Sequence, residues 1–130
     1  MKNRKKLYTA IFFFYALLVF AVSSYPSLEI PFRLPSRFLQ PDKLAHFIEY
    51  FIFAALYYLF RRQFQIRQKD ILIELFLWAM IIPIFDEMHQ LFIPGRSFEW
   101  YDVIADMLGF FTFIILNIII YKTRRKDGNH

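Results

Sequence analysis

Four long apolar stretches constrain the fold of this chain more than any other feature of its 130-residue sequence. They run over about residues 7–25, 43–60, 71–93 and 102–121. A helix needs roughly 17 to 25 apolar residues to cross the hydrocarbon core of a bilayer, and each stretch has about that length. Hydrophobic residues make up 58% of the chain, far more than in an ordinary soluble domain. We therefore predict an all-α integral membrane four-helix bundle, with a single transmembrane domain over residues 1–130.

The segments between these stretches contain residues that end helices. The first segment contains four prolines, the second is the basic segment 61–70, and the third is the turn Pro94-Gly95-Arg96. Proline lacks an amide donor, glycine accepts a positive φ, and a run of charges is costly to place in lipid. Pro83 lies inside the third stretch, where we expect it to kink the helix.

The distribution of basic residues predicts the orientation in the membrane. Twelve lysines and arginines flank one side of the four stretches: four before the first, four between the second and third, and four after the last. Only four lie on the other side, and basic flanks tend to stay in the cytoplasm. We predict a multi-pass protein of the cell membrane with both termini cytoplasmic, and we assign the basic runs to topology and not to nucleic-acid binding. A cleavable signal peptide is an alternative for the first stretch, which is longer than the usual apolar core of such peptides.

Acidic residues gather on the predicted outer side, which holds eight of the eleven. Within the helices, polar side chains pair at helical spacing: His46 with Glu49, Asp86 with Gln90, and Asp102 with Asp106. All of these lie within roughly 12 Å of the outer helix ends at a rise of 1.5 Å per residue. Three helices are therefore expected to present polar groups at one depth.

Two interpretations of this cluster are open. Polar residues between membrane helices often serve only to hold the helices together, which is the structural alternative. The acids, however, outnumber the bases, and buried carboxylates need a cation, protons or a ligand to neutralise them. His46, Glu49 and Asp86 are candidate ligands for a divalent metal such as zinc or manganese, although a single histidine is more often hydrogen-bonded structure than a ligand.

Four motifs in succession resemble those of VanZ-like membrane proteins. They are residues 42–51 (DKLAHFIEYF), 86–90 (DEMHQ), 94–98 (PGRSF) and 102–109 (DVIADMLG), and the resemblance covers about residues 8–120. Asp106 stands where the family commonly has asparagine, and the expected second glycine after Gly109 is absent from residues 110–113. The positions that match the family motifs are Lys43, His46, Glu49, Tyr50, Asp86, Glu87, Gln90, Arg96, Asp102, Asp106 and Gly109.

The resemblance implies a link to resistance against the glycopeptide antibiotic teicoplanin, without naming a reaction. We expect an extracytoplasmic site that binds or modifies a cell-envelope component, such as a lipid, a glycan precursor or a glycopeptide. The candidate acid–base or binding cluster is His46, Glu49, Asp86 and Glu87, and the candidate substrate-binding residues are Lys43, Tyr50, Gln90, Arg96, Asp102 and Asp106.

The sequence leaves open whether the protein is an enzyme, because no nucleophile with an adjacent base stands out. The alternative is a structural or accessory membrane protein. A proton-coupled carrier is a weaker alternative, since polar residues do not continue into the other half of the spans, where Glu74 and Asn117 are isolated. Oligomerisation in the bilayer is also left open.

Overall fold

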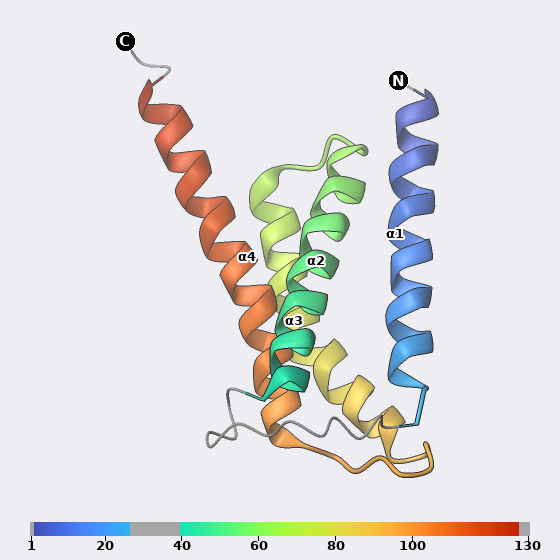
Figure 1. Cartoon of the computed structure of the whole chain (residues 1–130). Coiled ribbons are helices and arrows are strands. Elements are labelled where there is room, and N and C mark those ends of the chain that lie inside the picture. Colours follow the sequence, from blue (N-terminus) through green and yellow to red (C-terminus); the bar gives the residue numbers. More distant parts are fainter. Residues whose placement is uncertain (1, 27–39, 128–130) are drawn as a thin grey trace.

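The computed structural model describes residues 2–26 and 40–127, which form four helices (Figure 1). These are α1 (Lys2–Ser23), α2 (Pro41–Arg62), α3 (Gln68–Gln90) and α4 (Trp100–Asp127). The prediction of an all-α chain with four helices is confirmed.

Composition and length qualify three of these helices as membrane spans: Asn3–Ser23 in α1, Pro41–Arg62 in α2 and Trp100–Arg124 in α4. The third helix, although 23 residues long, does not qualify among the described residues. Glu74, Asp86 and Glu87 place three acids along its apolar length. The chain is thus a multi-pass helical membrane protein, and the predicted spans in the first, second and fourth stretches are confirmed as candidates.

The helices are arranged around a close contact between α2 and α4. This contact is the most extensive in the bundle, α3 packs on both helices, and α1 packs mainly on α2. The start of α1, the α2–α3 connection and the end of α4 lie at one end of the bundle, which we call the basic end (Figure 1). The other end holds the end of α1, the start of α2, the end of α3 and the start of α4, and we call it the polar end.

Gly109 explains the close approach of α2 and α4. A Cβ atom built on this residue would overlap the backbone carbonyl oxygen of Phe47 and lie 2.9 Å from the backbone nitrogen of Phe51. Because backbone atoms cannot turn aside as a side chain can, only glycine permits this helix spacing. The contact places the residues one and two turns earlier in α4, Asp106 and Asp102, beside α2.

The third helix ends at Gln90, three residues before the predicted limit. The amides of Leu91, Phe92 and Ile93 bond to carbonyls three residues back, which tightens the chain out of the α-helix. A turn follows in which the Arg96 amide donates to the Ile93 carbonyl at 3.1 Å and Gly95 has a φ of 78°. Proline followed by a glycine of positive φ is typical of a type II turn. The turn brings Arg96 back toward the end of α3.

The apolar side chains divide between a small core and a large exposed surface. Tyr50, Ile71, Leu75 and Phe110 are buried between the helices. Large exposed side chains cover α1 and the distal part of α4, including Phe13, Phe14, Leu17, Leu116 and Ile119. An apolar surface of this extent fits contact with lipid.

Candidate functional site

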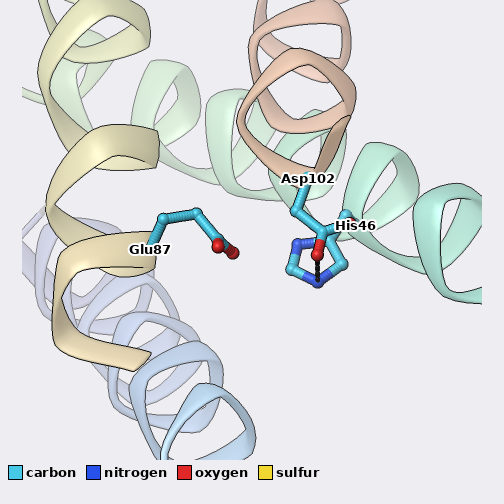
Figure 2. A group of neighbouring side chains, drawn as sticks. All are labelled: His46, Glu87 and Asp102. Carbon is cyan, nitrogen blue, oxygen red and sulfur yellow. Dashed lines mark ion pairs between the residues drawn. The ribbon is translucent and has the colours of Figure 1, made fainter. Parts of the chain in front are cut away.

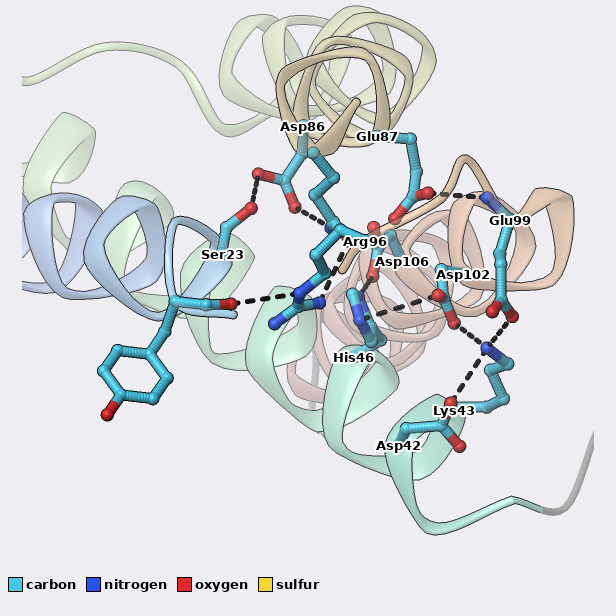
Figure 3. A network of polar contacts seen from close by, with 12 residues as sticks. Ser23, Asp42, Lys43, His46, Asp86, Glu87, Arg96, Glu99, Asp102 and Asp106 are labelled. Carbon is cyan, nitrogen blue, oxygen red and sulfur yellow. Dashed lines mark hydrogen bonds and ion pairs between the residues drawn. The ribbon is translucent and has the colours of Figure 1, made fainter. Parts of the chain in front are cut away.

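The polar end of the bundle contains most of the buried polar side chains of the described residues. Lys43 comes from α2, Glu87 and Gln90 from α3, and Asp102 and Asp106 from α4. They form one network with His46, Asp86, Arg96 and Glu99 (Figure 3). The prediction that three helices present polar groups at one depth agrees with this arrangement.

His46 lies at the centre of the network. Its Nδ1 is 2.9 Å from Asp106 Oδ1, and its Nε2 is 3.9 Å from Asp102 Oδ2. The Glu87 carboxylate points toward the same ring from α3 (Figure 2). One potential metal-ligand atom from each of His46, Glu87 and Asp102 lies within 4.8 Å of the others. The imidazole therefore has one nitrogen fixed by Asp106, while the other faces two acids.

Lys43 binds a second group of acids beside His46. Its Nζ lies 2.9 Å from Asp42, 2.5 Å from Glu99 and 2.6 Å from Asp102. An ammonium group has three donors and can pair with three carboxylates at once. Lys43 is a predicted substrate-binding residue, and in the structure it contacts acids of this chain.

The turn after α3 links Arg96 to two helices. Arg96 Nη1 donates to Gln90 Oε1 at 3.0 Å, and Arg96 Nε donates to the Tyr25 carbonyl at 3.1 Å. Asp86 accepts a hydrogen bond from the hydroxyl of Ser23 at 2.5 Å. These contacts join the chain at the end of α1 to the end of α3. Arg96 and Gln90, both predicted substrate-binding residues, are in direct contact.

Glu87 and Asp106 each have an oxygen that lacks a hydrogen-bond partner among the described residues. The side chains are fully buried, and the atoms are Glu87 Oε1 and Asp106 Oδ2. The other Glu87 oxygen accepts the Glu99 backbone amide at 2.8 Å. Asp102 Oδ1 is also buried without a well-directed hydrogen bond, but Lys43 Nζ stands 2.6 Å away and supplies a positive charge. A buried carboxylate oxygen without a partner is costly.

Glu49, one turn after His46 on α2, also borders an apolar groove. The groove has a volume of about 310 Å³, lies between α1 and α2, and is also lined by Tyr15, Leu18, Val19, Val22, Ala45, Ile48 and Ile52. The Tyr15 hydroxyl donates to the Glu49 backbone carbonyl at 3.0 Å and joins the two helices. Neither Glu49 nor Asp86 belongs to a metal-competent group of the described residues, so the predicted trio with His46 is replaced by His46, Glu87 and Asp102.

Three residues of the network were absent from the predicted site. Ser23 is buried against Asp86, and Asp42 and Glu99 both contact Lys43. Asp42 is next to Lys43 in the sequence, and Glu99 lies close to the turn at Gly95. The sequence could therefore have indicated that both belong to the site. The contact of Ser23 depends on how α1 docks, which no spacing within one helix reveals. Tyr50, a predicted site residue, is buried in the core of the bundle.

A multi-pass helical membrane protein with a buried, acid-rich cluster at one end of its bundle is the class that the fold and the site define. Residues 12–121 match the model of the VanZ/LLP1 family, so the chain belongs to that family. No curated protein and no solved structure matches the chain. The matched range contains the whole His46, Lys43 and Arg96 network, and the predicted family resemblance is confirmed.

Proposed function

We propose that α3 is a fourth membrane span and that both termini are cytoplasmic. The 23 residues of α3 extend roughly 34 Å, enough to cross a hydrocarbon core of about 30 Å. Its acids are paired or directed into the bundle: Glu74 binds Arg61, and Glu87 is fully buried. Twelve of the sixteen basic residues flank the basic end, which favours that end in the cytoplasm. The polar end then lies at the outer face.

At that face, the network binds or modifies a component of the cell envelope. The observation that supports this function is the buried carboxylate surplus, seen in the unpartnered oxygens of Glu87 and Asp106. Residues that only join helices satisfy one another, because an unpaired buried group weakens the fold. Acids kept buried without partners are typical of sites where stability is given up for binding.

The neighbouring groove favours a component with a lipid tail. Its apolar lining lies between α1 and α2, while Glu49 belongs to both the groove lining and the predicted polar site. An amphiphile could place its tail along this lining and its polar group near His46. His46, held by Asp106, is suited to transfer a proton if the component is modified.

The family resemblance makes glycopeptide susceptibility the first phenotype to measure. Cells that express the protein are compared with cells that express His46→Ala, Asp86→Ala or, as a control at the basic end, Glu74→Ala. We expect the first two variants to keep membrane abundance and lose teicoplanin protection, and the control to keep protection in proportion to its abundance. Equal loss of abundance in all three variants, with protection following abundance, would favour the structural alternative.

The absence of cysteine from the sequence makes the orientation directly testable. Ser97→Cys introduces a thiol in the exposed turn of the polar end, and Gln65→Cys introduces one in the exposed α2–α3 connection. A membrane-impermeant thiol reagent should label Ser97→Cys in intact cells and Gln65→Cys only after permeabilisation. The reverse pattern would contradict the proposed topology.

A further inference from the structure

We infer that His46, Glu87 and Asp102 bind a divalent transition-metal ion, with Zn²⁺ or Mn²⁺ as the fitting class. Their donor atoms come from three helices and lie within 4.8 Å of one another. Imidazole and carboxylate together suit these metals, whereas Mg²⁺ prefers oxygen ligands alone. This metal site lies at the same end of the bundle as the proposed envelope-binding site, but the inference rests on the geometry of the three ligands.

The unpartnered oxygen of Glu87 is an independent observation that points to a cation. Glu87 is fully buried, its Oε1 has no hydrogen-bond partner among the described residues, and its carboxylate points toward His46 and Asp102 (Figure 2). Its other oxygen is held by the Glu99 backbone amide. The carboxylate is thus fixed on one side and free on the side that faces the other two ligands.

Neighbouring groups hold the other two ligands in the same manner. Asp106 Oδ1 accepts from His46 Nδ1 at 2.9 Å, which leaves Nε2 to bind a metal. Lys43 binds Asp102 Oδ1 at 2.6 Å and leaves Oδ2 facing His46. Metal-binding histidines usually donate their second nitrogen to a carboxylate or carbonyl, and ligating carboxylates are themselves hydrogen-bonded. Every ligand therefore has the supporting contact that a metal site requires.

The distance between His46 and Asp102 is close to that of a zinc site, and Glu87 lies within 4.8 Å of both. Ligand atoms bound to one zinc ion at about 2.0–2.2 Å lie roughly 3.4 Å apart in a tetrahedron. His46 Nε2 and Asp102 Oδ2 are 3.9 Å apart, so these ligands need to approach by only about half an ångström. Three protein ligands leave a fourth position for water or an oxygen atom of an envelope ligand, which is the pattern of catalytic and not of closed structural zinc sites.

A second acidic group is not a metal site. Asp42, Glu99 and Asp102 also lie close together, but Lys43 Nζ is within 2.9 Å of each of them. The ammonium group already occupies the position that a cation would take.

Metal binding by the purified full-length protein tests the inference. The protein is isolated in detergent without a histidine tag, treated with a chelator and equilibrated with Zn²⁺ or, separately, with Mn²⁺. Bound metal is then measured by mass spectrometry after gel filtration. We expect one ion per chain. Glu87→Gln and His46→Gln should each weaken binding at least about 100-fold, and Asp106→Asn, which keeps a hydrogen-bond acceptor for His46, by about tenfold.

Glu74→Gln, at the basic end, serves as the control and should bind as the unaltered chain does. Glu87→Gln should fold, because an amide oxygen can still accept the Glu99 amide, and its melting temperature confirms this. Absence of retained zinc and manganese in the unaltered protein would overturn the inference, as would loss of binding in Glu74→Gln but not in Glu87→Gln. The proposed function would survive either result if His46→Ala still abolished the envelope phenotype.

Discussion

At the basic end of the bundle one arginine meets one glutamate, whereas at the polar end Lys43 and His46 face five carboxylates. Arg61 binds both oxygens of Glu74, at 2.6 and 2.7 Å, and Tyr57 donates a further bond at 2.9 Å. At the polar end the five acids are Asp42, Glu87, Glu99, Asp102 and Asp106. One group is balanced and the other is not.

The difference teaches what each group does. The Arg61–Glu74 pair is partly exposed, at 26% and 30% of the side-chain surfaces, and leaves no charge unmatched. This ion pair therefore has a structural role, which is to hold α2 against α3. The polar end keeps surplus acids buried, which lowers stability unless a ligand neutralises them. We therefore expect variants at the two ends to separate stability from function.

The largest expected effect comes from Lys43→Met. Removing the ammonium leaves Asp102 buried without its cationic partner, and loss of one partner of a buried ion pair costs about 3–5 kcal/mol. Thermal unfolding in detergent micelles should show a fall in melting temperature much larger than for any variant at the basic end. A change no larger than that of Arg61→Met would show that the polar end is not a buried charge network.

Gly109→Ala should have the next largest effect. The added methyl group meets the Phe47 carbonyl and forces α2 and α4 apart, and overpacking costs about 1–3 kcal/mol. Since Asp106 and Asp102 lie one and two turns earlier on α4, the variant should also weaken any binding at the polar end. Ala105→Gly, also on α4, is the matched control. Unchanged stability and binding in Gly109→Ala would contradict the close helix contact.

Arg61→Met tests the basic end and should have the smallest effect. A pair that is partly exposed contributes about 0.2–1 kcal/mol, so the melting temperature should fall slightly. Envelope phenotype and zinc binding should remain unchanged when corrected for the amount of protein. If Arg61→Met lost the envelope phenotype while the protein kept its normal abundance in the membrane, function would depend on both ends. That result would contradict the distinction between a structural basic end and a functional polar end.

The sequence predicted the helical fold because apolar length, proline and charge runs act locally. The depth of the polar residues followed from helix rise alone, and His46, Glu87 and Asp102 were all expected near one end. Helix rise did not predict which of these polar side chains contact one another. Asp86 and Glu87 are neighbours about 100° apart on α3, and only the packing of α3 on α4 turns Glu87, not Asp86, toward His46.

The limits of α3 were less predictable. Its apolar pattern continues to Ile93, but the chain leaves the helix after Gln90 through tight bonds and the turn at Gly95. Its acids, moreover, prevent it from qualifying as a span by composition, although tertiary contacts bury or pair Glu74 and Glu87. A count of charged residues in a helix does not show which charges are paired or buried in the folded protein, so it can exclude a helix that spans the membrane.

The most direct test of the account compares the metal-free melting temperatures of Glu87→Gln and Glu74→Gln. Glu87→Gln removes a buried charge and keeps the Glu99 contact, so we predict that it melts above the unaltered protein. Glu74→Gln loses its ion pair with Arg61 and should melt lower. If Glu87→Gln instead lowered the melting temperature as much as Glu74→Gln, the surplus acid at the polar end would be structural, and the central claim would be wrong.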